Sequence, residues 1–286
     1  MCRLLVYRGR EILMSDLLTR TEQSLIRQSY KAMEREEPLN GDGFGVGWYD
    51  REIDATPCVF TSVRPAWSNR NLHRLAEKVR STCFFAHVRA ASSGMSVSEA
   101  NCHPFQYGRF LWMHNGRIED FNRIKRTLRQ DLADEYYNFI QGTTDSEHIF
   151  ALFLNNLGSR INDYSGNDLA DAIDVTIKQL NEWAAHVGLE ERCFFNFALT
   201  DGDYVVITRY TTRTDAKPET LYVTRGSRFE RVGNTYRMSR DDERPEALIV
   251  ASEPLTTDRS DWESVPRNHA LVIDKNLTIE ARSIDS

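Results

Sequence analysis

A cysteine directly after the initiator methionine is the residue in this sequence best suited to do chemistry. Cys2 is small enough for Met1 to be removed during synthesis, and the mature chain would then begin at Cys2. Its thiol and a free α-amino group would share one residue, so the amine could take the thiol proton directly or through one water. Because the usual pKa values are roughly 8.5 for a thiol and about 8 for an α-amine, this transfer is nearly balanced. We therefore predict that Cys2 is a nucleophile, although a small residue at position two also serves processing alone.

Three further residues carry groups that would hold an amino acid and stabilise charge during its reaction. Arg89 follows the apolar run at 83–88, and its guanidinium can bind a substrate α-carboxylate through two parallel hydrogen bonds. Asn115 and Gly116 place a side-chain amide beside an unhindered backbone N–H, the donors that an oxyanion hole requires. Taken singly, Arg89 could equally be a surface ion-pair partner, and Asn115-Gly116 is most often a simple turn.

Two more segments add an imidazole and a carboxylate. His103 lies in an extended turn, where a histidine is more often structural than catalytic. Asp145 begins an expected helix and could pair with a substrate ammonium, or it could serve only to cap the helix. His87, His114 and Cys102 raise the alternative of a metal site with His103. Their spacings match no zinc pattern, so we expect neither a metal nor a cofactor.

The glycine-rich stretch 41–47 invites comparison with a phosphate-binding loop. A dinucleotide-binding fingerprint lies between a strand and a helix, whereas these alternating glycines run into a β-like segment at 46–49. Glycine at alternate positions removes the side chains from one face of a strand, so another backbone or a ligand can approach closely. We predict a turn followed by a strand that packs tightly near a pocket.

The rest of the pattern supplies the elements that must position these residues. Apolar runs and turn signals predict strands at 4–7, 57–64, 83–89, 109–114, 194–200, 204–210, 220–224, 247–251, 269–274 and 278–282. Helical spacing predicts helices at 15–36, 69–80, 119–140, 145–157 and 167–187. The polar segment 225–246 is expected to be a loop-rich insertion, and Arg123, Lys125, Arg126 and Arg129 form a basic stripe typical of a solvated helix face. Strands at both ends of a helical middle favour a single α+β domain, residues 1–286, built as layers.

Composition limits the classes of partner and compartment. The 286 residues carry a formal net charge of -6, which argues against nucleic acid or an anionic membrane as the main partner. No apolar run approaches the ~20 residues that span a bilayer, and Glu11 and Asp16 interrupt any apolar signal core near the N-terminus. The five cysteines are an odd number without a C-x-x-C pair, which indicates a reducing, cytoplasmic location.

The order of these segments resembles that of class II glutamine amidotransferases. Six motifs carry the resemblance across the first half of the chain: 1–3, 41–45, 86–92, 101–105, 114–116 and 144–147. In the second half, Ala251-Ser252-Glu253-Pro254-Leu255 and the segment 262–266 are similar to the short, stand-alone members of the family. An ordered set of motifs is far more specific than any one of them.

The resemblance implies an N-terminal-nucleophile hydrolase fold, in which two antiparallel sheets are stacked between helical layers (αββα). It implies that Cys2 is the nucleophile and that Asn115 with the Gly116 N–H forms the oxyanion hole. The other roles that it implies concern substrate binding: the α-carboxylate by Arg89, the α-ammonium by Asp145, and the lining of the glutamyl pocket by His103 and Ser92. Where many synthetase-linked relatives carry a tryptophan after the arginine, this chain has Ala90.

The leaving amine is the open part of the implied activity. Within the family, the sequence is most similar to the fungal subunit that degrades glutathione with a peptidase-like partner, and less so to the bacterial γ-glutamyl hydrolase of ergothioneine synthesis. Both imply a small-molecule γ-glutamyl peptide or conjugate as substrate. One alternative is a glutaminase subunit that supplies ammonia to a separate synthase. Another is a catalytically silent γ-glutamyl-binding protein that retains Met1. The sequence leaves the partner subunit and a homo-oligomer open.

Overall fold

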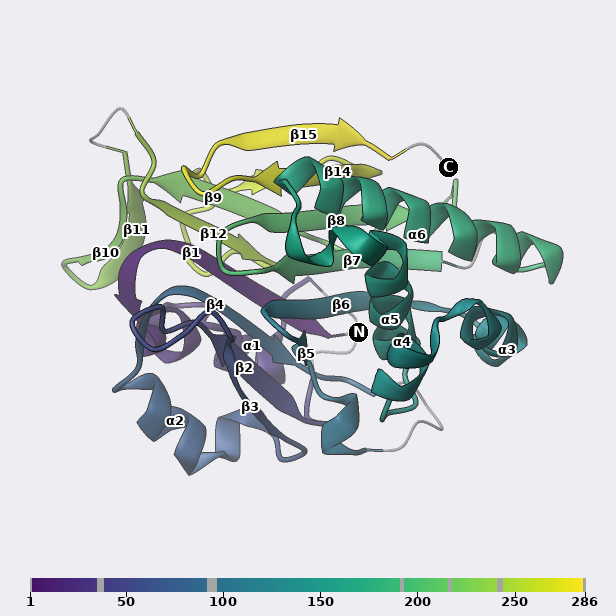
Figure 1. The fold of residues 1–286 in the computed structure, drawn as a ribbon. Coiled ribbons are helices and arrows are strands. Elements are labelled where there is room, and N and C mark those ends of the chain that lie inside the picture. Colours follow the sequence, from purple (N-terminus) through teal and green to yellow (C-terminus); the bar gives the residue numbers. More distant parts are fainter. Residues whose placement is uncertain are drawn as a thin grey trace.

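The computed structural model describes residues 2–34, 39–91, 97–190, 193–215, 218–240 and 244–284. Two antiparallel sheets are stacked face to face, with helices on both outer sides (Figure 1). The first sheet has the order β13 (Glu263–Ser264), β9 (Tyr222–Gly226), β12 (Ala247–Ala251), β1 (Arg3–Leu13), β4 (Arg80–Val88), β2 (Phe44–Trp48) and β3 (Cys58–Ser62). The second has the order β15 (Ile279–Ser283), β14 (His269–Ile273), β8 (Val205–Thr211), β7 (Cys193–Thr200), β6 (Phe110–Ile118) and β5 (Phe105–Tyr107).

Alternating side chains of the strands show why the molecule has four layers. In β1, Leu4 and Val6 pack into the core between the two sheets, whereas Leu5 and Tyr7 pack into the core under the outer helices. Successive side chains of a strand point to opposite faces, so a strand that is apolar on both faces must be covered on both. β1 meets this condition at the centre of its sheet, between β12 and β4. The predicted α+β, four-layer αββα architecture is therefore confirmed.

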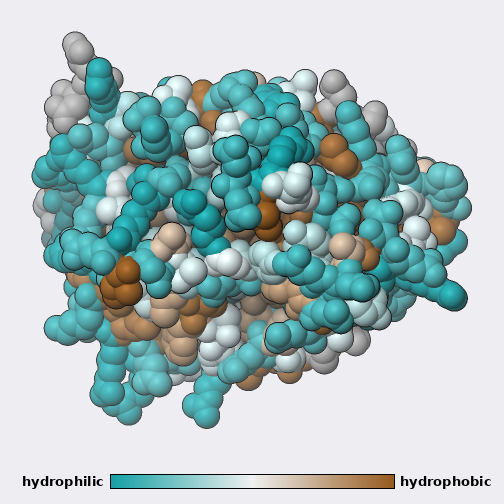
Figure 2. Space-filling view, viewed as in Figure 1, coloured by the Kyte–Doolittle hydropathy of each residue, from teal (hydrophilic) through white to brown (hydrophobic). Residues whose placement is uncertain are grey.

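The two outer layers are built from different helices. The first sheet is covered by α1 (Leu25–Lys31) and α2 (Arg70–Ala76), which share its outer core. The second is covered by α5 (Asp145–Leu157) and α6 (Gly166–His186), with α3 (Asn122–Asp131) and α4 (Asp134–Phe139) beside them. The face in Figure 2 is mainly hydrophilic, with hydrophobic side chains in small groups. No helix within the described residues has the length and apolar character to cross a bilayer.

Several predicted boundaries are wrong for local reasons. The helix expected at 15–36 is a short helical turn at Asp16–Arg20 followed by α1, which begins where the Ser24 side chain accepts a hydrogen bond from the Arg27 N–H. The helix expected at 119–140 is interrupted between α3 and α4, where the Ala133 N–H donates to Asn155 Oδ1 of α5 instead of to its own helix. Both breaks place a polar partner where helical hydrogen bonding stops.

The segment 225–246 also departs from its prediction. It contains a hairpin, β10 (Arg228–Val232) and β11 (Thr235–Ser239), where a loop-rich insertion was expected. Phe229, Tyr236 and Met238 bury one face of the hairpin against the outer core of the first sheet. The other face of the hairpin carries charged side chains. The average composition of the segment is therefore polar, although apolar and polar residues alternate along its strands.

Candidate active site

Five of the seven residues singled out from the sequence line one pocket of about 310 Å³. They come from the start of β1, the end of β4, the segment before β5, the middle of β6 and the first turn of α5: Cys2, Arg89, His103, Gly116 and Asp145. Asn115 lies beside the pocket without lining it. Ser92 and Met1 lie outside the described residues.

The Cys2 thiol is held by the backbone of Ala90. The Ala90 N–H donates to Sγ at 3.4 Å, and Sγ lies 3.7 Å from the Ala90 carbonyl oxygen. Burial raises the pKa of Cys2, while the Ala90 N–H and the charges of Arg89 and Arg3 act in the opposite direction. Because burial has the larger effect, the thiol is protonated at neutral pH and needs a base before it can attack.

Arg89 is positioned by the glycine-rich turn. Its N–H donates to the Gly43 carbonyl at 2.8 Å, and its own carbonyl accepts from the Asp42 N–H at 3.0 Å. The Asp42 carboxylate then accepts from the Ala91 N–H at 2.8 Å. The Arg89 side chain is 3% exposed, so the guanidinium is a buried cation facing the pocket.

The missing side chains of β2 allow the His103 segment to approach. A Cβ at Gly45 would lie 2.2 Å from the His103 carbonyl oxygen, well inside any allowed contact. The prediction of a tightly packed glycine strand beside a pocket is thus confirmed. The close approach sets His103 against the first sheet.

The ring of His103, which lines the pocket, packs against the ring of His87. Their centroids are 4.3 Å apart. Both side chains are buried, and among the described residues neither has a hydrogen-bond partner at a ring nitrogen. Burial lowers the pKa of both histidines, for His87 to about 3. Both rings are therefore neutral, and His103 lines the pocket as an uncharged side chain. Within the described ranges, no group of three or more histidine, cysteine or acidic side chains is arranged to hold a metal ion.

Gly116 lies inside a strand, where the sequence suggested the end of one. β6 continues to Ile118, and Gly116 pairs with Phe195 of β7. A Cβ at Gly116 would lie 2.0 Å from the Phe194 carbonyl oxygen and 2.4 Å from His114 Nε2. Only glycine fits here, and its backbone consequently borders the pocket.

Asn115 is buried beside Ser252. Its Nδ2 is 3.4 Å from Ser252 Oγ, while its buried Oδ1 has no hydrogen-bond partner among the residues that the structure describes. The nitrogen and oxygen of an amide are assigned from such contacts. With the two exchanged, the Ser252 hydroxyl donates to Oδ1 and Nδ2 becomes the free donor that an oxyanion hole needs.

Asp145 is the first residue of α5, and Thr144 is the cap. The Thr144 hydroxyl accepts from the Glu147 N–H at 3.3 Å. The Asp145 carboxylate accepts from the N–H groups of Ile118 and Ser146, each at 2.8 Å. These bonds occupy part of the carboxylate's capacity, which leaves lone pairs for an ammonium. Asp145 is 5% exposed and, with Arg89, gives the pocket one buried charge of each sign.

Sequence reasoning missed the residues that hold the N-terminal strand. The Ser252 hydroxyl accepts from the Leu4 N–H at 3.0 Å. Arg3 forms a buried ion pair with Glu253 at 2.8 Å and donates to the Cys2 carbonyl oxygen at 3.0 Å. The sequence indicated Ser252 and Glu253 only through the family resemblance. No local sequence pattern predicts that residue 252 contacts residue 4.

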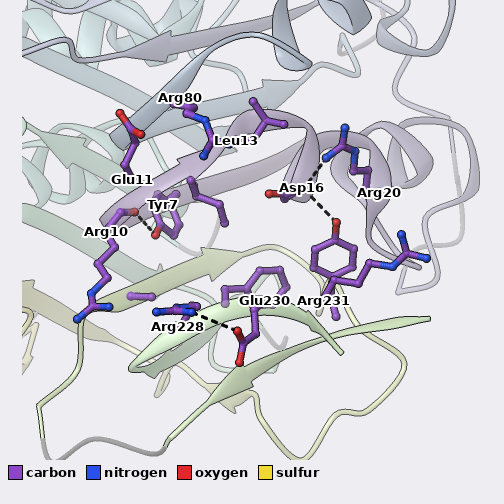
Figure 3. A pocket seen from close by; sticks show the side chains of 14 residues that line it. Tyr7, Arg10, Glu11, Leu13, Asp16, Arg20, Arg80, Arg228, Glu230 and Arg231 are labelled. Atoms are coloured by element: carbon purple, nitrogen blue, oxygen red, sulfur yellow. Dashed lines mark hydrogen bonds and ion pairs between the residues drawn. The ribbon is translucent and has the colours of Figure 1, made fainter. Parts of the chain in front are cut away.

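A larger cavity of about 570 Å³ lies between β1 and the β10–β11 hairpin (Figure 3). Arginines and acids line it, and several are paired with each other: Asp16 with Arg20 at 3.0 Å and Glu230 with Arg228 at 3.6 Å. Its described lining contains neither cysteine nor histidine. The smaller pocket is the one that contains a nucleophile.

Comparisons with known proteins agree with this geometry. A family model described as "Glutamine amidotransferases class-II" matches residues 14–283. A probable glutamine amidotransferase of Saccharomyces cerevisiae, DUG3, is 42% identical over 304 residues, covering 100% of this chain and 85% of the yeast protein. A γ-glutamyl-hercynylcysteine sulfoxide hydrolase of Mycolicibacterium smegmatis is 26% identical over 270 residues, covering 94% of each protein. The solved structure of a glutamine aminotransferase class-II domain protein from Silicibacter pomeroyi superimposes with a TM-score of 0.69 at 25% identity, covering 100% of both chains.

Proposed function

The chain belongs to the class II glutamine amidotransferases, and on that premise we propose that Cys2, once Met1 is removed, cleaves γ-glutamyl amide bonds through a glutamyl thioester. The observation that carries the proposal is the meeting of three groups in one pocket: the Cys2 thiol, the Arg89 guanidinium and the Asp145 carboxylate. Buried charges of opposite sign match the α-carboxylate and α-ammonium of a glutamyl group. Together they would fix its orientation relative to the thiol.

Attack on the amide begins with proton transfer. The free α-amine of Cys2 takes the Sγ proton, and the thiolate forms a bond to the γ-carbonyl carbon. The carbonyl electrons move to the oxygen, and the oxyanion accepts hydrogen bonds from Asn115 Nδ2 and the Gly116 N–H. Neutral His103 lines the glutamyl side of the pocket, and we assign Ser92 to the same lining.

Collapse of the tetrahedral intermediate breaks the C–N bond. The leaving amine receives a proton from the Cys2 ammonium and departs, which leaves a glutamyl thioester. A water molecule, deprotonated by the regenerated amine, then attacks the thioester. Glutamate leaves, and the proton returns to Sγ, so the enzyme emerges unchanged.

We propose a γ-glutamyl peptide or conjugate, rather than free glutamine, as the substrate. The name of the mycobacterial relative specifies a γ-glutamyl conjugate, and the chain matches that protein over most of its length. Ala90 adjoins Cys2 with a methyl group only, which leaves space for a leaving group larger than ammonia. A peptidase-like or synthase partner subunit and a homo-oligomer remain part of this proposal. So does a cytoplasmic location, which five free cysteines support.

The proposal is tested by measuring glutamate release from glutamine, glutathione and other γ-glutamyl amides, with wild type beside Cys2→Ala. We expect release that depends on Cys2 and a higher kcat/KM for γ-glutamyl peptides than for glutamine. Equal glutamate release by Cys2→Ala and wild type would contradict the assignment of Cys2 as the nucleophile. Release from glutamine alone would instead favour an ammonia-supplying subunit.

A further inference from the structure

One face of α3 connects the Cys2 pocket to a second, shallow pocket. Asn122, Lys125, Arg126 and Arg129 have the spacing i, i+3, i+4 and i+7, which places them on one side of a helix. Together with Gln130 and Tyr137 they line a pocket of about 390 Å³, which we call the α3 pocket. Asn122 also lines the Cys2 pocket, so the two adjoin at this residue.

The α3 pocket is lined by basic residues that differ in whether their side chains already have partners. Of the six described residues that line it, three are basic and none is acidic. Arg129 is engaged, because its Nε donates to His148 Nε2 at 3.0 Å and its guanidinium lies 5.3 Å from the Tyr137 ring centre. The side chains of Lys125 and Arg126 form no hydrogen bond or ion pair within the part of the chain that the structure describes.

Lys125 is half-buried, which is costly for an unpaired ammonium. Burial lowers its pKa, as does the neighbouring charge of Arg129, while Glu147 acts in the opposite direction. The Glu147 carboxylate is already bonded to the N–H groups of Gln141 and Gly142, at 2.9 and 2.6 Å. An anion that entered the α3 pocket would therefore relieve an existing electrostatic cost.

The distance along α3 from Asn122, which lines both pockets, to the two cations is short. Lys125 and Arg126 lie one helical turn beyond Asn122, a rise of about 5.4 Å along the axis. An extended dipeptide spans about 7 Å. Two acidic residues, Glu119 and Asp120, line this side of the Cys2 pocket. Glu119 is paired with Arg117 at 3.1 Å, and Asp120 also has a partner, so neither is a free repelling charge.

We propose that the α3 pocket binds the carboxylate at the far end of the leaving group, through Lys125 and Arg126. The substrate class is then γ-glutamyl peptides whose leaving group is a short peptide with a free C-terminal carboxylate. This inference rests on the proposed function, since it extends the same site from the glutamyl group to the group that departs.

The first test measures binding without turnover. Cys2→Ala protein is titrated calorimetrically with γ-Glu-Cys-Gly and with the same peptide as its C-terminal amide. We expect the acid to bind about tenfold tighter than the amide, a difference typical of a partly exposed charge-assisted contact. Adding Lys125→Gln and Arg126→Gln should remove the advantage and leave the affinity for the amide unchanged. Adding Arg123→Gln, which removes an exposed cation of α3 that is outside the lining of the α3 pocket, should keep the advantage.

Equal affinity for acid and amide in the Cys2→Ala protein, or an advantage that survives the double substitution, would overturn the inference. Kinetics with Cys2 intact give a second readout: Lys125→Gln/Arg126→Gln should raise KM for the acid and leave kcat for both peptides unchanged. Absence of turnover with every substrate would defeat the proposed function, whereas the binding comparison would still decide the carboxylate subsite.

Discussion

At Cys2, burial and the surrounding donors act on the thiol in opposite directions. Burial raises the pKa of the thiol, and the Ala90 N–H and the charges of Arg89 and Arg3 only partly offset it. A thiol in this state is a poor nucleophile at neutral pH unless a base stands next to it. The α-amine released by removal of Met1 would be that base, so the surroundings of Cys2 favour activation by its own amine.

Asn115 and Ser252 give a graded prediction for the oxyanion hole. Asn115→Ala should lower kcat by about 10²–10³-fold, the usual cost of losing one oxyanion donor. Ser252→Ala keeps the donor but removes the hydroxyl that orients it and that accepts the Leu4 N–H. We expect a smaller loss, about tenfold in kcat with little change in KM, measured as glutamate release.

Asn181→Ala is the matched control, because that amide bonds to Tyr210 from α6 and lies outside the pocket lining. It should leave kcat unchanged. Near-normal turnover by Asn115→Ala, or a greater loss in Ser252→Ala than in Asn115→Ala, would show that the assignment of the donor is wrong.

The types of residue needed for the site could be predicted, but their supporting contacts could not. The residue types that supply a thiol, a guanidinium, an imidazole and a carboxylate can be identified in the sequence, and five of the predicted residues line one pocket. The backbone of Ala90 holds Sγ, and Ser252 holds Asn115 from 137 positions away. Backbone donors and long-range pairs leave no local signal in a sequence.

Among the elements, β2 allows the His103 segment of the Cys2 pocket to approach because Gly45 has no side chain. Gly45→Ala would place a methyl group 2.2 Å from the His103 carbonyl oxygen, which is a backbone atom and cannot turn aside as a flexible side chain could. We expect a loss of about 1–3 kcal/mol in the free energy of unfolding, together with a raised KM because His103 must shift. Urea unfolding and substrate kinetics measure the two effects.

Gly233→Asn in the β10–β11 turn is the control. That glycine has a φ of +63° and open space around it, which asparagine tolerates. It should leave both quantities unchanged. If Gly45→Ala behaved in the same way, the close contact between β2 and the His103 segment would not matter for the site.

Element types were easier to predict than their ends. The strand before Asn115 was expected to stop at 114, because Asn-Gly usually marks a turn, yet β6 pairs with β7 through Ile118. The pairing places Gly116 against the Phe194 carbonyl, where its missing Cβ is required. The pairing of β6 with β7 therefore overrides the local preference of Asn115-Gly116 for a turn, and it does so at residues with a predicted function.

At the scale of the whole molecule, stacking the layers buries histidines that must stay neutral. The pKa of His87 is lowered to about 3 and that of His148 to about 4, mainly by burial. In the unfolded chain a histidine titrates near 6.5. Between these values the unfolded state binds protons that the folded state does not. The contribution of these buried histidines to the free energy of unfolding is therefore fully present above about pH 6.5 and decreases as the pH is lowered.

His87→Phe should make unfolding less sensitive to acid. Removing this one buried imidazole should reduce the slope of unfolding free energy against pH by about 1 kcal/mol per unit between pH 6 and 4.5. Urea titrations across this range measure it, with His186→Gln on the exposed surface of α6 as control. A slope unchanged by His87→Phe would mean that His87 already takes up a proton in the folded protein.

The layered class of the fold could be predicted from strands at both ends of a helical middle. The order of strands could not, because β1 pairs with β4 and also with β12, nearly 250 residues later. Such pairing depends on the complementary faces of whole sheets. The αββα arrangement came from resemblance, and the three separate cores of the molecule confirm it.

The most direct test of the central claim is an intact mass measured after reaction with a glutamine analogue that carries an electrophilic carbon in place of the γ-amide. We predict a chain that begins at Cys2 and carries one adduct, which peptide mapping places on Cys2 and which Cys2→Ala lacks. A protein that hydrolyses γ-glutamyl amides while retaining Met1, or while carrying the adduct on another residue, would contradict the account.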